Sequence, residues 1–107
     1  MTHTQLLHDY FDAANAHDVE KTLQYFASDA VVQDEGATHQ GRDAIRQWLH
    51  STNIKYHTQY SDLHIVSSGE EATVRATVSG TFPGSPIQLT SKFKFANSHI
   101  VALTCGL

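Results

Sequence analysis

Residues 10–36 read YFDAANAHDVEKTLQYFASDAVVQDEG, and the change from helical to extended patterning within them decides the fold. Beginning shortly before this stretch, at residue 6, apolar side chains recur at helical spacing: Leu6, Leu7, Tyr10, Phe11 and Ala14. That stripe predicts a first amphipathic helix. Asp18 is a suitable N-cap for a second, short helix, with Val19, Leu23 and Phe26 facing inward.

The second part of the stretch is extended. Ser28-Asp29 indicates a turn, and residues 30–34 predict a short strand because they include β-branched residues. Glu35-Gly36 turns the chain into a brief return strand at residues 38–40. A third helix follows, with Asp43 as its expected cap and with apolar positions at Ala44, Ile45, Trp48 and Leu49.

Beyond this helix the period of the pattern changes from about 3.6 residues to about 2, which is typical of strands. Residues 54–66 alternate weakly, and we expect a bend or bulge within them. Residues 72–82 and 87–95 alternate clearly on either side of a Pro-Gly-Ser-Pro loop, and a last strand covers residues 99–105. Helices followed by a meander predict a single α+β domain over residues 1–107, with helices on one face of a curved sheet that encloses a pocket.

Charge and hydropathy restrict the partners. The chain of 107 residues has a net charge of −4 and no cluster of Lys or Arg, which argues against nucleic-acid binding. No apolar run approaches the ~20 residues of a membrane span. The N-terminus lacks the basic start and apolar stretch of a signal peptide. We therefore expect a cytoplasmic protein with no membrane contact.

Metal ions and other cofactors are not expected. The eight histidines show no HxH or HExxH spacing, and a single cysteine, Cys105, excludes an internal disulfide. Cys105 lies in the apolar run IVALTCGL, so we interpret it as a buried, inert thiol.

Residues 10–36, together with GRDAIRQW at residues 41–48, resemble the signature of the nuclear transport factor 2-like superfamily in its SnoaL-like branch. That branch includes polyketide cyclases and ketosteroid isomerase. The run SGTFPGSPIQLTSKFKF at residues 79–95 is similar to a hairpin of bacterial members. The resemblance implies a cone-shaped fold in which three N-terminal helices pack on a strongly curved, mixed or antiparallel sheet. It also implies a homodimer formed through the outer sheet face.

The resemblance to ketosteroid isomerases implies roles for individual residues. Those enzymes use a tyrosine of the first helix as oxyanion donor and a carboxylate after the first strand as proton shuttle. Tyr10 and Asp34 fall on these two positions. A protonated aspartate that also donates to the oxyanion is replaced here by Ser91, two residues before Phe93-Lys94-Phe95. A serine hydroxyl is the weaker donor, which argues against steroid isomerisation itself.

The residues themselves leave alternatives open. Asp34 is either a base whose pKa is raised in an apolar pocket or an ordinary turn residue. Tyr10 is either a donor that points into the pocket or a core tyrosine. Aromatic side chains that suit a flat apolar ligand are Trp48, Tyr56, Tyr60, Phe82, Phe93 and Phe95, and ordinary core packing explains each of them taken alone. Ser91 and His39 are the polar candidates beside them.

Three functions follow from this pattern. The first is an isomerase- or cyclase-type enzyme in which Asp34 moves a proton on a small apolar carbonyl compound and Tyr10 stabilises the enolate. The second is a module that binds a small apolar ligand without chemistry. The third is a dimerisation domain whose cavity is filled by its own side chains.

Overall fold

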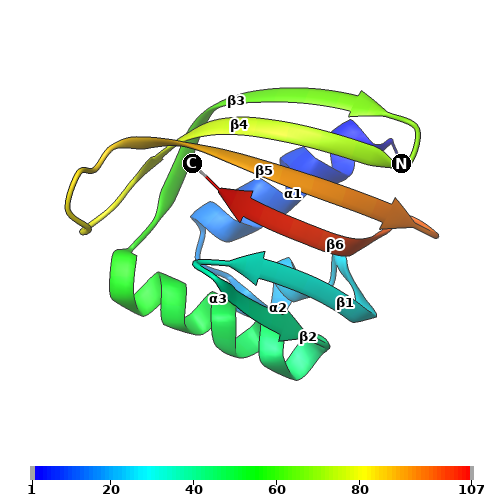
Figure 1. Cartoon of the computed structure of the whole chain (residues 1–107), viewed down its shortest axis with the longest axis horizontal. Helices are drawn as coiled ribbons and strands as arrows, with labels where there is room; N and C mark the ends of the chain where they lie inside the picture. Colours follow the sequence, from blue (N-terminus) through cyan, green and yellow to red (C-terminus); the bar gives the residue numbers. More distant parts are fainter. Residues whose placement is uncertain (1, 107) are drawn as a thin grey trace.

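The structure, a computed structural model, describes residues 2–106 (Figure 1). Its elements are α1 (His3–Asn15), α2 (Val19–Leu23), β1 (Phe26–Asp34), β2 (Ala37–Gln40), α3 (Arg42–Tyr56), β3 (Gln59–Ser68), β4 (Glu71–Ser79), β5 (Ile87–Ala96) and β6 (His99–Gly106). The strands form one six-stranded sheet in the order β2-β1-β6-β5-β4-β3.

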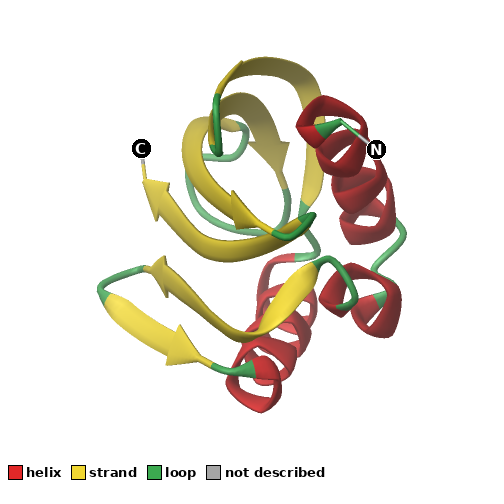
Figure 2. Ribbon diagram, turned by 90° about the vertical axis from the view of Figure 1, so that its right-hand side faces the viewer, coloured by secondary structure: helices red, strands yellow, loops and turns green. Residues whose placement is uncertain are grey.

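The sheet is mixed. Strands β3 to β6 form the predicted antiparallel meander, and β1 pairs parallel with β6, so the first and last strands lie side by side. The sheet is strongly curved, and the helices lie on one side of it (Figure 2). The predicted α+β class is confirmed.

Local capping explains where two of the helices begin. Thr2 accepts a hydrogen bond from the Gln5 backbone N–H (3.1 Å), and Asp18 accepts one from the Lys21 N–H (3.2 Å), as predicted for Asp18. The prediction that Asp43 caps α3 is wrong. Gly41 precedes this helix without a side-chain cap, and Asp43 lies in its first turn.

Helix α3 is longer than the sequence pattern indicated. Residues 54–56 belong to this helix and not to a strand, because no Gly or Pro interrupts residues 42–56. The helix ends where His57 adopts a left-handed conformation with φ 49°. Tyr56 therefore projects from a helix, one turn after Thr52 and two turns after Trp48.

Two strand boundaries also differ. The predicted turn at Ser28-Asp29 lies inside β1, where the pairing register with β6 shifts between Phe26 and Val31. Strand β4 ends at Ser79, so Phe82 lies in the β4–β5 loop. A Cβ on Gly80 would collide with the Tyr56 carbonyl oxygen, so the glycine lets this loop approach the end of α3.

The alternation of β4 and β5 determines the core. Ala72, Val74, Ala76 and Val78 are buried, and so are Phe93 and Phe95 on the facing positions of β5. Four aromatic rings then meet edge to face inside the sheet, with centroids 5.0–6.1 Å apart: Tyr10, Phe11, Phe26 and Phe93. These rings fill the interior of the domain, and a pocket lies beside them where β4, β5 and their connecting loop meet α3.

Candidate active site

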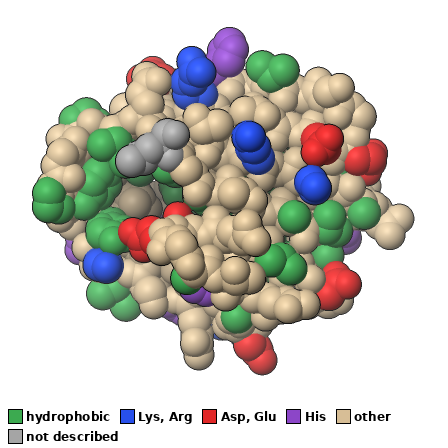
Figure 3. Space-filling view, in the orientation of Figure 1, with side chains coloured by type: hydrophobic (Ala, Val, Ile, Leu, Met, Phe, Trp, Pro, Cys, Tyr) green, Lys and Arg blue, Asp and Glu red, His purple; other side chains and the backbone are tan. Residues whose placement is uncertain are grey.

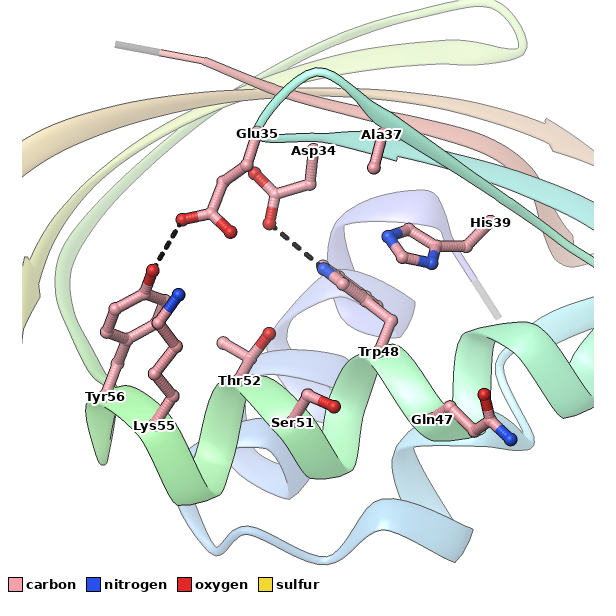
Figure 4. A pocket seen from close by; sticks show the side chains of 10 residues that line it. All are labelled: Asp34, Glu35, Ala37, His39, Gln47, Trp48, Ser51, Thr52, Lys55 and Tyr56. Carbon is pink, nitrogen blue, oxygen red and sulfur yellow. Dashed lines mark hydrogen bonds between the residues drawn. The ribbon is translucent and has the colours of Figure 1, made fainter.

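A cleft lies where the β1–β2 turn faces helix α3. It consists of two pockets that share four lining residues: Asp34, Glu35, Thr52 and Tyr56. The hairpin pocket, about 310 Å³ in volume, is completed by Ala37, His39, Gln47, Trp48, Ser51 and Lys55 (Figure 4). The strand pocket, about 240 Å³ in volume, is completed by Thr58, Tyr60, Val78, Phe82, Pro83, Ile87 and Leu89.

The two pockets differ in polarity. Apolar side chains from β4, β5 and their connecting loop dominate the strand pocket, and a hollow rimmed by hydrophobic side chains, with acidic side chains at its edge, is visible on this face (Figure 3). Polar side chains of α3 dominate the hairpin pocket. A ligand that spans both pockets would place an apolar part and a polar part on either side of Asp34.

Asp34 is the last residue of β1 and is partly buried. The indole N–H of Trp48 donates a hydrogen bond to its Oδ2 atom over 3.0 Å (Figure 4). Burial raises the pKa of the Asp34 carboxyl above its usual value, and the negative charge of Glu35 adds to this rise. The hydrogen bonds from Trp48 and from the Glu35 backbone lower the pKa and so oppose it. A carboxylate with these properties is a stronger base than one in water.

The side chain of Glu35 points towards Tyr56 near the end of α3, whereas that of Asp34 points towards Trp48 (Figure 4). It has a left-handed backbone with φ 53°, which it shares with the following Gly36 (φ 77°). The Tyr56 hydroxyl donates a hydrogen bond to Glu35 Oε1 over 2.8 Å, and the Lys55 ammonium lies 5.0 Å from the centre of the Tyr56 ring. Two side-chain hydrogen bonds, one from Trp48 and one from Tyr56, therefore attach the hairpin turn to α3.

Besides Asp34, four of the predicted site residues line the cleft. Trp48 and His39 lie in the hairpin pocket with their rings 6.1 Å apart, Phe82 lies in the strand pocket, and Tyr56 borders both. Phe82 packs edge to face against Tyr56 with ring centroids 5.8 Å apart.

Three other predicted site residues do not line either pocket. Phe93 is 1% exposed within the aromatic core, and Ser91 is buried on β5. Tyr10 is 4% exposed and reaches only a small void of about 20 Å³ beneath the cleft. Phe93 and Ser91 lie deeper than expected because the aromatic core fills the space that the pattern had suggested for a ligand.

The sequence analysis missed Glu35, Thr52 and Lys55. A helix extended to residue 56 would have indicated Thr52, because Trp48, Thr52 and Tyr56 then lie on one face at intervals of four. Glu35 has no such signal, since Glu-Gly is ordinary turn chemistry.

Burial and the negative charge of Asp34 contribute to raised pKa values of Cys105, Tyr10 and Tyr60. Burial raises the pKa of the Cys105 thiol to about 12 and is reinforced by the Asp34 charge, so the thiol stays protonated and unreactive. Within the described residues, no three His, Cys, Asp or Glu side chains gather closely enough to hold a metal ion. In residues 2–106 no helix is both long enough and apolar enough to cross a membrane.

Comparison with known proteins assigns the chain to a family. The model of the SnoaL-like domain matches residues 7–103. This protein belongs to the SnoaL-like family. A candidate polyketide cyclase from Sinorhizobium meliloti is 39% identical to this SnoaL-like domain, with a TM-score of 0.91 over 95% of this chain and 94% of that one.

More distant structures share the fold of this SnoaL-like domain. SalBIII, an epoxide hydrolase/cyclase-like enzyme of pyran ring formation in salinomycin, is 19% identical with a TM-score of 0.84, over 95% of this chain and 87% of that one. A cystatin-fold protein from Novosphingobium aromaticivorans is 18% identical with a TM-score of 0.84, over 100% and 99% of the two chains. No functionally curated protein matches significantly.

Proposed function

We propose that this SnoaL-like domain is an isomerase- or cyclase-type enzyme that moves a proton on a small, largely apolar carbonyl compound. Asp34 is the proton shuttle. The observation that carries the proposal is the position of Asp34: a partly buried carboxylate, with its pKa raised by burial, at the border of an apolar pocket.

The reaction follows from the chemistry of a carboxylate beside a carbonyl compound. Asp34 takes a proton from the carbon next to the carbonyl group, and the electron pair of that C–H bond moves to give an enolate. Asp34 then returns the proton to another carbon of the same molecule, or the enolate carbon attacks an electrophilic carbon and closes a ring. The hydrogen bond from Trp48 to Oδ2 fixes the orientation of the carboxylate that takes and returns the proton.

The family supports this reaction class. The candidate polyketide cyclase that is 39% identical to this chain carries ring closure in its name, and SalBIII is an enzyme of pyran ring formation. Polyketides contain carbonyl groups separated by acidic carbons, which a carboxylate base deprotonates readily.

The test measures exchange of carbon-bound protons with deuterium oxide. The probe is 2-tetralone, an apolar bicyclic ketone with acidic protons next to its carbonyl group, and exchange is followed by NMR. We expect Asp34→Asn to lower the protein-catalysed exchange rate by about 10²–10⁴, the usual contribution of a general base. Asp29→Asn, which removes an exposed carboxylate from the same strand, is the matched control. Equal rates for wild type and Asp34→Asn would refute the shuttle.

A binding module without chemistry is the second candidate, favoured by Ser91 in place of an acid donor. It predicts saturable binding of an apolar ketone, seen as a change in Trp48 fluorescence, with no exchange above the rate in buffer.

We also propose that two copies pair through the outer sheet face. A hollow of about 430 Å³ lies on that face between Lys92 and Thr73, with the 58% exposed Val66 at its border. Light scattering is expected to give twice the 11.8 kDa mass of the chain, and Val66→Asp to shift it towards the monomer. A monomer at all concentrations would refute the pairing.

A further inference from the structure

Tyr60 and Tyr10 lie one behind the other, as seen from the cleft. Tyr60 lines the strand pocket together with Asp34, and it also lines the small void beneath it. Tyr10 lines the void and is absent from the lining of both pockets. A ligand in the strand pocket therefore meets Tyr60 before Tyr10.

The N–H and the carbonyl group of the Tyr60 backbone are both hydrogen-bonded. The Asn15 side chain, at the end of α1, accepts from the Tyr60 N–H (2.7 Å) and donates to the Tyr60 carbonyl oxygen (2.9 Å). The Phe11 ring packs 5.1 Å from the Tyr60 ring. These contacts fix the phenol in position before a ligand arrives.

The strand itself aims this side chain inward. Tyr60 pairs with Val78, which pairs with Ile87, so the three form a row across β3, β4 and β5 that lines the strand pocket. Immediately afterwards β3 has a bulge, with a register shift between Ser61 and His64 and with Asp62 at φ 52°. A bulge changes the direction in which the side chains on its two sides point. In β3 it lies between the inward-facing residue that lines the pocket and those that pack against the core.

The Tyr60 phenol stays protonated. Burial raises the pKa of this phenol well above its usual value, and the negative charge of Asp34 acts in the same direction. A protonated phenol can donate a hydrogen bond at neutral pH. It therefore meets the requirement for stabilising negative charge on a substrate oxygen.

We propose that Tyr60, and not Tyr10, donates the hydrogen bond that stabilises the oxyanion formed when Asp34 removes a proton. This inference rests on the proposed function. In the step, the C–H electron pair moves towards the carbonyl oxygen, which accepts a hydrogen bond from the Tyr60 hydroxyl without taking its proton. Tyr10 lies behind Tyr60 and is part of the aromatic core.

The experiment uses 4-nitrophenolate, a stable anion whose oxygen stands in for the enolate oxygen. It is added to the full chain at a pH at which the free probe is ionised, and binding is followed through quenching of Trp48, the single tryptophan of the chain. Asp34→Asn serves as the background, because an uncharged amide imitates the carboxyl group after it has taken the proton. Tyr60→Phe and Tyr10→Phe are compared in that background, since each removes one hydroxyl and keeps the ring.

We expect Tyr60→Phe to weaken probe binding by about 10- to 100-fold, as for loss of a hydrogen bond to a charged group. Tyr10→Phe is expected to change it by less than about twofold. Circular dichroism and thermal unfolding of each variant check that the fold is retained. A larger loss with Tyr10→Phe, an equal affinity for both variants, or no binding of the probe to any variant would overturn the assignment of Tyr60.

The same titration separates the two proposals. Asp34→Asn alone is expected to tighten probe binding relative to wild type, because it removes a negative charge from the pocket. If it does not, Asp34 does not face the oxyanion and the proposed function fails. The comparison of the two tyrosine variants is made within one background and is read independently of that result.

Discussion

The indole nitrogen of Trp48 and the carboxylate of Asp34 are joined by a 3.0 Å hydrogen bond between helix α3 and the end of strand β1. The bond fixes the direction of a partly buried carboxylate and stabilises its charged form, while burial destabilises that form. Burial has the larger effect, so the net result is a raised pKa of Asp34. The strength of the base is therefore adjusted by one neighbouring side chain.

Removing this donor is expected to raise the Asp34 pKa further. Trp48→Phe deletes the indole N–H and keeps an aromatic ring, so desolvation acts with less opposition. Carbon-detected NMR titration of the Asp34 carboxyl in both proteins measures the change. Thr52→Val, at the border of both pockets, removes a hydroxyl that does not bond to Asp34 and is the control. An unchanged or lower pKa in Trp48→Phe would contradict this reading of the hydrogen bond.

The ionised Asp34 side chain is expected to lower the free energy of unfolding at neutral pH. Because its pKa is raised in the folded protein, the folded state binds the proton more tightly than the unfolded state. Its favourable contribution is complete below the unfolded pKa of about 3.9 and is lost as the pH rises through the folded pKa. Asp34→Asn should therefore melt at a higher temperature than wild type at pH about 7, and the difference should shrink towards pH about 3.

Thermal unfolding monitored by circular dichroism across this pH range provides the measurement. Asp29→Asn, at an exposed position of β1, is expected to show no such pH-dependent gain. A lower melting temperature for Asp34→Asn at neutral pH would show that other contacts of the carboxylate outweigh its desolvation.

Asn15 is expected to be important for stability although its side chain lies at the end of a helix. Asn15→Ala leaves the N–H and carbonyl groups of Tyr60 without their partners. An unsatisfied buried polar group costs about 1–3 kcal/mol, so the free energy of unfolding in urea should fall by at least about 1 kcal/mol. Asp12→Ala, an exposed change on the same helix, is the control and is expected to stay within about 0.5 kcal/mol.

The aromatic core is expected to carry much of the stability. Phe93 is 1% exposed and contacts two aromatic rings of α1, so Phe93→Ala should lower the free energy of unfolding by about 3–5 kcal/mol. Ile54→Ala is the comparison, because Ile54 is 74% exposed on α3. A loss below about 1 kcal/mol in Phe93→Ala would indicate that the interior is looser than the structure describes.

The sheet was more predictable than the site. In β4 every second residue from Ala72 to Val78 is apolar and buried as expected, because a strand with one face on the core follows strict alternation. In β5 the same holds for Phe93 and Phe95, whereas Ile87 and Leu89 are partly buried and line the strand pocket. Residues 54–56 show why the pattern fails at boundaries. Ile54 and Tyr56 alternate as a strand does, but Tyr56 also continues the helical spacing of Trp48, and the helix continues until His57 turns left-handed.

The candidate site depends on features that periodicity does not contain. Asp34 is predicted because the resemblance to ketosteroid isomerases places it on their proton-shuttle carboxylate after the first strand. The position of Tyr60 relative to Tyr10 depends on the bulge in β3 and on the contact with Asn15, which lies 45 residues before Tyr60 in the sequence. Phe93 was expected in the pocket because sequence does not show how completely Tyr10, Phe11 and Phe26 fill the interior.

Strand β6 lies between β1 and β5, although it is the last strand in the chain. Until it is in place, β1–β2 and β3–β5 are two separate sheets with no shared ladder, and each has an open edge. The parallel pairing of Val31 with Ala102 closes a very long loop, which makes it a slow contact to form. During synthesis the two smaller sheets therefore cannot join until β6 has emerged from the ribosome.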